Sequence, residues 1–99
     1  MKKFHKSHFH VAFFGDAEAR KNDSIFIDAY DTAQILAKNK FTSVNGGGPG
    51  IMLASTLGAK STGGRVELVV INKKDQPSKH YEGQSPENIP LANRIYTLK

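Results

Sequence analysis

The sequence predicts an α/β fold in which strands and helices alternate along the chain in the order β-α-β-α-β-loop-β. Three short segments have the apolar composition of strands, and the two stretches between them carry apolar residues at spacings of three and four. Glycines lie at the turns that separate these segments. Strands that alternate with helices indicate a parallel sheet with right-handed crossovers and helices on both faces, which is a three-layer arrangement.

The first strand and the first helix are expected in the N-terminal part of the chain. Segment 8–14 becomes continuously apolar before it stops at Gly15, as in a strand that is buried on both faces. A helix is expected from Ser24 onward, with Asp23 or Ser24 as its N-cap and with Lys38 and Lys40 at its C-terminal end. Its apolar positions recur at helical spacing and are Phe26, Ala29, Tyr30, Ala33, Leu36 and Ala37.

The second strand and the second helix flank a run of glycines. Segment 41–45 has the composition of a short strand and leads directly into this run, after which 51–61 returns to helical spacing. Pro49 suits the first turn of that helix, because its missing N–H would have no partner there. Gly63 and Gly64 can end the helix, because glycine adopts the left-handed conformation without a Cβ clash.

The C-terminal part is expected to complete the sheet. Val66–Ile71 has the composition of a third buried strand, and Arg94–Leu98 that of a fourth short one. Between them, 72–90 is polar and holds three of the four prolines, which predicts a surface excursion. The whole of 1–99 is therefore expected to form one domain.

Length and composition bound the class of protein. A chain of 99 residues without cysteine can form a single small core but neither disulfides nor a thiolate site. The longest apolar stretches, 11–14 and 66–71, are much shorter than the roughly 20 residues that cross a bilayer, so we expect a cytoplasmic protein with no membrane contact. The net charge of +5 favours an anionic partner, but the basic residues are scattered, which does not favour nucleic acid.

The run Gly46-Gly47-Gly48-Pro49-Gly50 is the candidate binding feature. Glycines let the backbone approach a ligand closely, and the N–H groups and dipole of the helix that follows attract an anion such as phosphate. The run follows a strand, at the edge where open α/β sheets bind ligands, and Gly15 with Asp16 is expected at the same edge. The alternative is that these glycines only form a tight turn, and spacing alone does not separate the two interpretations.

Two common nucleotide fingerprints are excluded by spacing. The dinucleotide pattern G-x-G-x-x-G belongs in the first strand-to-helix turn, which here holds only Gly15. The triphosphate loop requires G-x-x-x-x-G-K-S/T, whereas Lys60-Ser61 follows Ala59 at a helix end. We therefore expect neither a dinucleotide nor another resident cofactor.

Other candidate groups carry weaker signals. His5, His8 and His10 lie close in sequence and could bind a transition metal, but no fixed carboxylate or thiolate accompanies them, so a polar strand start is favoured and no metal site is expected. His80 stands alone in the polar segment. The acidic residues between the first strand and the first helix favour loop and cap roles, and no Ser/His/Asp arrangement is evident.

Three segments in this order resemble a known family. Phe14-Gly15-Asp16, then Gly46-Gly47-Gly48-Pro49-Gly50-Ile51-Met52, then Gly63-Gly64-Arg65-Val66 is similar to the N-terminal half of the Lonely Guy-type (LOG) proteins. These are cytokinin-activating phosphoribohydrolases, long labelled lysine decarboxylases, with a Rossmann-like fold. The resemblance covers about 11–71, with a weaker echo to Lys99.

The resemblance implies a Rossmann-like (half-)domain that forms oligomers and binds a nucleoside 5′-monophosphate, whose N-glycosidic bond the family hydrolyses to a base and ribose 5-phosphate. By position, the residues around the nucleotide would be Gly15, Asp16, Gly46, Gly47, Gly48, Gly50 and Met52. Asp16 stands where many members carry Ser.

The family's second motif, Pro-Gly-Gly-x-Gly-Thr-x-x-Glu, which supplies the catalytic glutamate, does not occur in these 99 residues. We therefore expect a truncated or split member whose catalytic residue is unknown. The alternatives are a phosphoribohydrolase lineage, a non-catalytic nucleotide-binding module, and an assembly subunit that pairs with itself or with a complementing chain through an open sheet edge.

Overall fold

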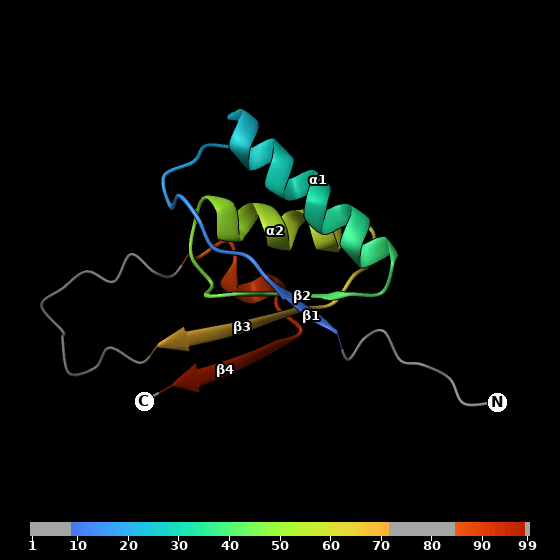
Figure 1. Cartoon of the computed structure of the whole chain (residues 1–99). Helices are drawn as coiled ribbons and strands as arrows, with labels where there is room; N and C mark the ends of the chain where they lie inside the picture. Colours follow the sequence, from blue (N-terminus) through green and yellow to red (C-terminus); the bar gives the residue numbers. More distant parts are fainter. Residues whose placement is uncertain (1–8, 72–84, 99) are drawn as a thin grey trace, which may run out of the picture.

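The computed structural model describes residues 9–71 and 85–98, and it is an α/β fold with four parallel strands. The strands are β1 (His10–Ala12), β2 (Thr42–Asn45), β3 (Val66–Ile71) and β4 (Arg94–Leu98), and they lie in the sheet in that order. Helix α1 (Ser24–Lys38) connects β1 to β2, and α2 (Ile51–Lys60) connects β2 to β3 (Figure 1). A 3₁₀ turn, η2 (Ile89–Leu91), precedes β4. The predicted order of elements is confirmed.

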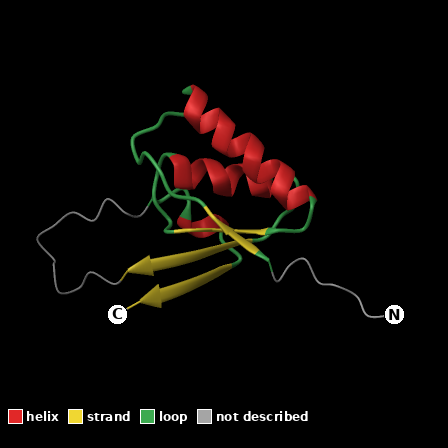
Figure 2. Cartoon of the chain, viewed as in Figure 1, coloured by secondary structure: helices red, strands yellow, loops and turns green. Residues whose placement is uncertain are grey.

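The two helices lie on the same face of the sheet (Figures 1 and 2). This arrangement differs from the expected helices on both faces, so the described residues form two layers rather than three. The reason is the strand order: each strand is added beside the preceding one in the same direction, and right-handed crossovers then place both helices on one side. Alternation of strands and helices predicts the parallel sheet but does not fix this order.

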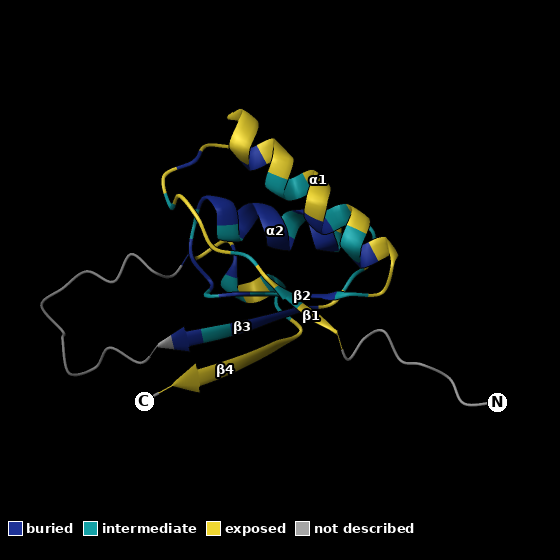
Figure 3. Ribbon diagram, viewed as in Figure 1, coloured by how far each residue is buried: buried dark blue, intermediate teal, exposed yellow. Residues whose placement is uncertain are grey.

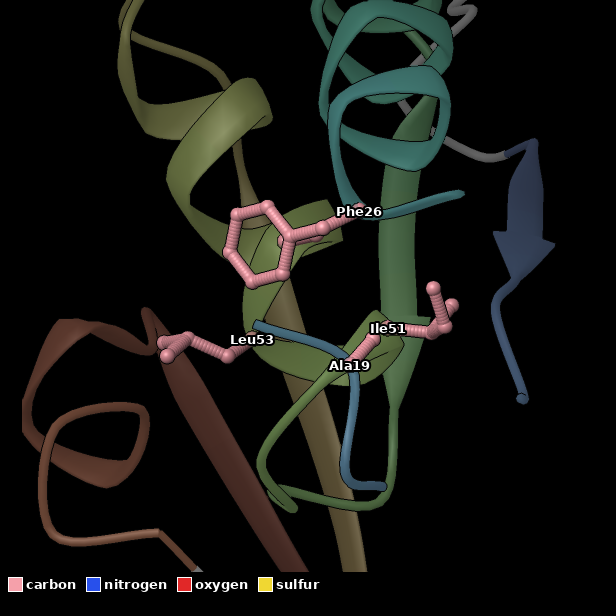
Figure 4. Close-up of a cluster of buried hydrophobic side chains, with 5 residues drawn as sticks. Ala19, Phe26, Ile51 and Leu53 are labelled. Carbon is pink, nitrogen blue, oxygen red and sulfur yellow. The ribbon is translucent and has the colours of Figure 1, made fainter. Parts of the chain in front are cut away.

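The core lies between this face of the sheet and the helices. Val66, Leu68 and Val70 alternate along β3 and are buried against Ala37 of α1 and Ala59 of α2 (Figure 3). A second cluster lies nearer the start of the helices, where Phe26 packs against α2 (Figure 4). Its buried members are Ala19, Phe26, Ile51, Leu53 and Ala54.

Close contact between the helices depends on Gly58 of α2. A Cβ on this residue would lie 2.1 Å from the backbone oxygen of Tyr30 in α1, so only glycine allows this approach.

Neither α1 nor α2, the helices that the structure describes, has the length and apolar character needed to cross a membrane.

Strand β1 is shorter and more exposed than its sequence predicts. It covers three residues at one edge of the sheet, with β2 as its neighbour, and Phe14 just beyond it is 76% exposed. The expectation of a strand buried on both faces is therefore wrong for this chain as described.

Two local expectations at the helix starts are also corrected. Asp23 is the N-cap residue of α1, but its carboxylate accepts the backbone N–H of Arg20 at 2.8 Å instead of a helical N–H. Pro49 precedes the N-cap residue Gly50 of α2 and so lies outside the first helical turn. At the other end of α2, Gly63 has the expected positive φ of 74°, and its N–H bonds the carbonyl of Lys60.

Candidate anion-binding site at the glycine loop

The glycine loop, residues 46–50, joins the carboxyl end of β2 to the start of α2. Gly47 and Gly50 have φ values of 83° and 70°, which side-chain-bearing residues rarely adopt. A Cβ on Gly50 would lie 2.1 Å from the backbone oxygen of Asp16. The loop after β1 and the glycine loop are therefore in direct backbone contact, as the sequence predicts for turns at one edge of a parallel sheet.

Gly15 and Asp16 fix the start of α2. The backbone oxygen of Asp16 accepts the N–H of Ile51 at 3.1 Å, and a Cβ on Gly15 would lie 2.9 Å from Cγ1 of Ile51. The carboxylate of Asp16 accepts the N–H of Glu18 at 2.8 Å, which closes a local turn. This carboxylate lies in an exposed residue beside the helix start.

A buried side chain, Asn45, supports the loop from below. Its Oδ1 accepts the N–H of Gly47 at 2.8 Å, and its Nδ2 donates to the hydroxyls of Ser55 at 3.0 Å and Thr56 at 2.9 Å. Because an N–H must face an oxygen, these contacts fix which way the amide of Asn45 is turned. The last residue of β2 thus links the loop to the first turns of α2.

Residues far along the chain close the same network. The N–H of Ser85 donates to the carbonyl of Gly47 at 2.7 Å, and Nδ2 of Asn88 donates to the carbonyl of Gly48 at 3.0 Å. Asn88 also donates to Oδ1 of Asn45 at 3.2 Å and accepts the hydroxyl of Thr56 at 2.8 Å. The segment predicted as a surface excursion therefore places two buried residues, Ser85 at 6% and Asn88 at 0% exposure, against the loop.

Several backbone N–H groups at this edge have no hydrogen-bond partner in the part of the chain that the structure describes. They belong to Gly46, Gly48, Gly50, Met52 and Leu53. The last two lie in the first turn of α2, where the helix dipole places partial positive charge. Free N–H groups at a helix start, next to a glycine loop, have the chemistry of an anion site.

A shallow apolar cavity of about 250 Å³, widely open to solvent, adjoins this edge between the loop after β1 and helix α1. Gly15 and Ile51, which contact each other at the glycine loop, also line the cavity, and Asp28 contributes a carboxylate. The remaining lining residues are Phe13, Phe14, Ile25, Ala29 and Thr32.

The comparisons with known proteins agree with this fold. Residues 8–93 match the model of the SLOG cluster4 family. The chain belongs to the SLOG cluster4 family. The SLOG superfamily includes LOG-like proteins, so the resemblance seen in the glycine motifs is confirmed as a LOG-type, Rossmann-like protein.

A solved structure shares the fold of this SLOG cluster4 chain. The X-ray structure of TM1055, a Northeast Structural Genomics Consortium target, is 18% identical and superposes with a TM-score of 0.54. The match covers 91% of this chain and 46% of TM1055, so the chain spans about half the length of that protein. No protein of curated function matches the sequence.

The structure of the SLOG cluster4 chain brings together the predicted residues Gly15, Asp16, Gly46, Gly47, Gly48, Gly50 and Met52 at one edge of the sheet. Sequence reasoning missed the supporting residues Ser55, Thr56, Ser85 and Asn88, of which Ser85 acts through its backbone N–H. Asn45 directly precedes the glycines, and this position could have identified it as a residue that supports the loop. Asn88 lies 43 residues from Asn45, in a polar segment without a recognisable motif or periodicity.

The remaining candidates do not join this site. Nε2 of His10 lies 3.4 Å from Oε1 of Glu67 on β3, and no group of metal-ligating side chains occurs in 9–71 or 85–98. His5, His8 and His80 lie outside the described residues. At the far end of α2, burial lowers the pKa of Lys60, with added repulsion from Arg65, and its ammonium donates to Asn93 at 2.6 Å.

Proposed function

We propose that this chain binds a nucleoside 5′-monophosphate with the phosphate on the glycine loop. The observation that supports the proposal is the group of unpartnered N–H groups in the loop and at the start of α2. These groups offer several donors to the oxygens of one phosphate, and the helix dipole favours its charge. The net charge of +5 also favours an anionic ligand.

The neighbouring groups suit the rest of a nucleotide. The apolar cavity beside Gly15 and Ile51 can receive the flat face of a base, and the carboxylate of Asp28 in its wall can accept a hydrogen bond from an amino group. The carboxylate of Asp16 would repel phosphate but can accept hydrogen bonds from ribose hydroxyls. In this proposal the phosphate lies at the helix start and the sugar beside Asp16.

Titration of the labelled protein with AMP, ribose 5-phosphate and inorganic phosphate, followed by amide NMR, tests this proposal. The amide signals of Gly48, Gly50 and Met52 are expected to shift with all three ligands, and the signal of Gly63, at the far end of α2, is the internal control. AMP alone is expected to shift the signals of residues that line the cavity. Absence of saturable shifts at the loop would refute the proposal.

Hydrolysis of the N-glycosidic bond is the activity that the LOG-type resemblance suggests. Such cleavage requires a carboxylate near the anomeric carbon, to stabilise the transition state or to direct water. No residue described here is assigned that role, because the family's glutamate motif does not occur in the sequence. Chromatographic assay for adenine released from AMP decides between an enzyme and a binding module.

A second candidate role, assembly with another copy or with a complementing chain, is favoured by the exposed edge at β1. Phe9 and Phe14, which flank this strand, are 43% and 76% exposed. An unprotected apolar sheet edge tends to pair with a strand of another chain, so this edge favours assembly. Light scattering of the wild type and of Phe14→Ser tests this role, with Ile27→Ser as an equally apolar surface control on α1. A wild-type chain that stays monomeric would exclude self-assembly.

A further inference from the structure

Asn88 is a fully buried polar residue whose side chain makes all its hydrogen bonds to groups that hold the glycine loop. Its exposure is 0%, and its Nδ2 donates both to the carbonyl of Gly48 and to Oδ1 of Asn45. Its Oδ1 accepts the hydroxyl of Thr56. Every donor and acceptor of the amide is used, so the side chain has one defined orientation.

The network fixes the direction of one particular peptide unit. In a trans peptide the C=O and the following N–H point in opposite directions. The carbonyl of Gly47 is held by the N–H of Ser85 at 2.7 Å, and this directs the N–H of Gly48 away from the buried network. The neighbouring N–H of Gly47 is used by Asn45, so the Gly48 N–H is the unpaired one in these two consecutive peptide units.

Asn88 holds both of the groups that produce this orientation. Its backbone N–H lies 3.0 Å from the carbonyl and 3.3 Å from the hydroxyl of Ser85, which ties residue 85 to the residue whose side chain holds the loop. Through Asn45 and the carbonyl of Gly48 it also fixes the loop from the other side. An apolar residue could fill the same volume without the cost of burying an amide, so packing alone does not account for Asn88.

We propose that Asn88 is a positioning residue that keeps the N–H of Gly48 directed at the bound anion. The inference rests on the proposed phosphate site for its functional meaning. The geometry that it invokes, however, exists without a ligand and can be measured separately. It also assigns a role to segment 85–88, which the sequence motifs of the glycine loop do not include.

Asn88→Asp is the sharpest test, because it keeps the size of the side chain and the acceptor for Thr56. The substitution removes the donor to Gly48 and Asn45 and places an oxygen against two other oxygens. Asn93→Ala is the control: Asn93 accepts the N–H of Val66 at 2.8 Å and the ammonium of Lys60, and neither contact involves the loop.

Two readouts separate positioning from general stability. In Asn88→Asp, amide hydrogen exchange of Gly47 is expected to accelerate more than that of Leu68 in β3, and the Kd for inorganic phosphate is expected to rise about tenfold. In Asn93→Ala, Gly47 exchange relative to Leu68 and the phosphate Kd are expected to stay at wild-type values. Equal acceleration of both amides in Asn88→Asp, or an unchanged Gly47 exchange, would overturn the proposal.

Failure of the phosphate site and failure of the positioning role give different results. If the wild type binds neither phosphate nor AMP, the proposed function fails, while selective acceleration at Gly47 still supports the structural part. If Asn88→Asp does not fold, Thr56→Val replaces it, because this change keeps the shape of the side chain and removes the hydroxyl that contacts both Asn88 and Asn45. It is expected to give the same selective acceleration at Gly47 with a smaller amplitude, and uniform exchange would overturn the inference.

Discussion

Gly50 is the position where a single methyl group should damage the site most. In Gly50→Ala the new Cβ would lie 2.1 Å from the oxygen of Asp16 and 2.6 Å from the backbone carbon of Ala17. The neighbouring atoms belong to backbone, so no side chain can rotate away. The loop after β1 must therefore move, and this movement breaks the 3.1 Å hydrogen bond from Ile51 to Asp16.

The expected loss of stability follows from two terms. A residue with a side chain at φ 70° and ψ −127° is strained by about 1 to 3 kcal/mol. Loss of the Ile51 hydrogen bond adds about 1 kcal/mol. A total of about 2 to 4 kcal/mol lowers the melting temperature of a domain of this size by roughly 10 to 25 °C.

Urea denaturation followed by circular dichroism measures the effect, and Gly63→Ala is the matched control. Gly63 has a similar φ of 74°, but a Cβ there would meet nothing within 4 Å. The control therefore carries backbone strain of about 1 kcal/mol without the overlap. If Gly50→Ala is no more destabilising than Gly63→Ala, the close approach of the two loops is refuted.

Three further substitutions test other contacts. Gly58→Ala should lower the free energy of unfolding by more than about 1 kcal/mol, because the new Cβ would overlap the backbone oxygen of Tyr30. Alanine is the better helix former, so equal or higher stability would contradict the close helix crossing. Ser43→Ala should raise the free energy of unfolding by about 1 kcal/mol, seen as a higher urea midpoint at unchanged m-value, because the Ser43 hydroxyl is fully buried and has no partner among the described residues. A loss of stability would indicate an unseen hydrogen bond. Lys21 and Glu87 form a surface ion pair at 2.9 Å, and a double-mutant cycle should give a coupling free energy below about 1 kcal/mol that falls with added salt. A larger coupling free energy would show that this pair holds segment 85–88 in place.

The local parts of the fold could be predicted from the sequence. Strands β3 and β4 were predicted at Val66–Ile71 and Arg94–Leu98, the ranges that the structure has, and helix α1 was predicted to begin at Ser24, as it does, and to end around Lys38 and Lys40. Helical spacing and a run of branched apolar residues are local signals that tertiary packing did not override. The glycine loop was located for the same reason, since its turn requirements lie within five consecutive residues.

The features that were missed depend on relations between distant segments. The apolar end of 8–14 does not reveal whether its strand lies at the centre or the edge of a sheet, and β1 lies at the edge. The alternation of strands and helices likewise does not determine beside which edge of the growing sheet each strand is added. The position of both helices on one face was therefore not predicted. Asn88 has no periodic or motif context, because its partners lie 32, 40 and 43 residues away.

This division between local and distant signals also bears on how the site is assembled. The path from β2 through the glycine loop to α2 is local, so the turn can form early with the helix, but the carbonyls of Gly47 and Gly48 stay unpaired until segment 85–88 docks. Docking requires closure of a loop of about forty residues. The entropic cost of this closure is offset only when the buried side chain of Asn88 forms its hydrogen bonds with Asn45 and Gly48. The orientation of the Gly48 N–H is therefore a property of the completed domain. A peptide that contains the glycine motif alone would lack it, so short motifs of this kind are weak predictors of anion binding.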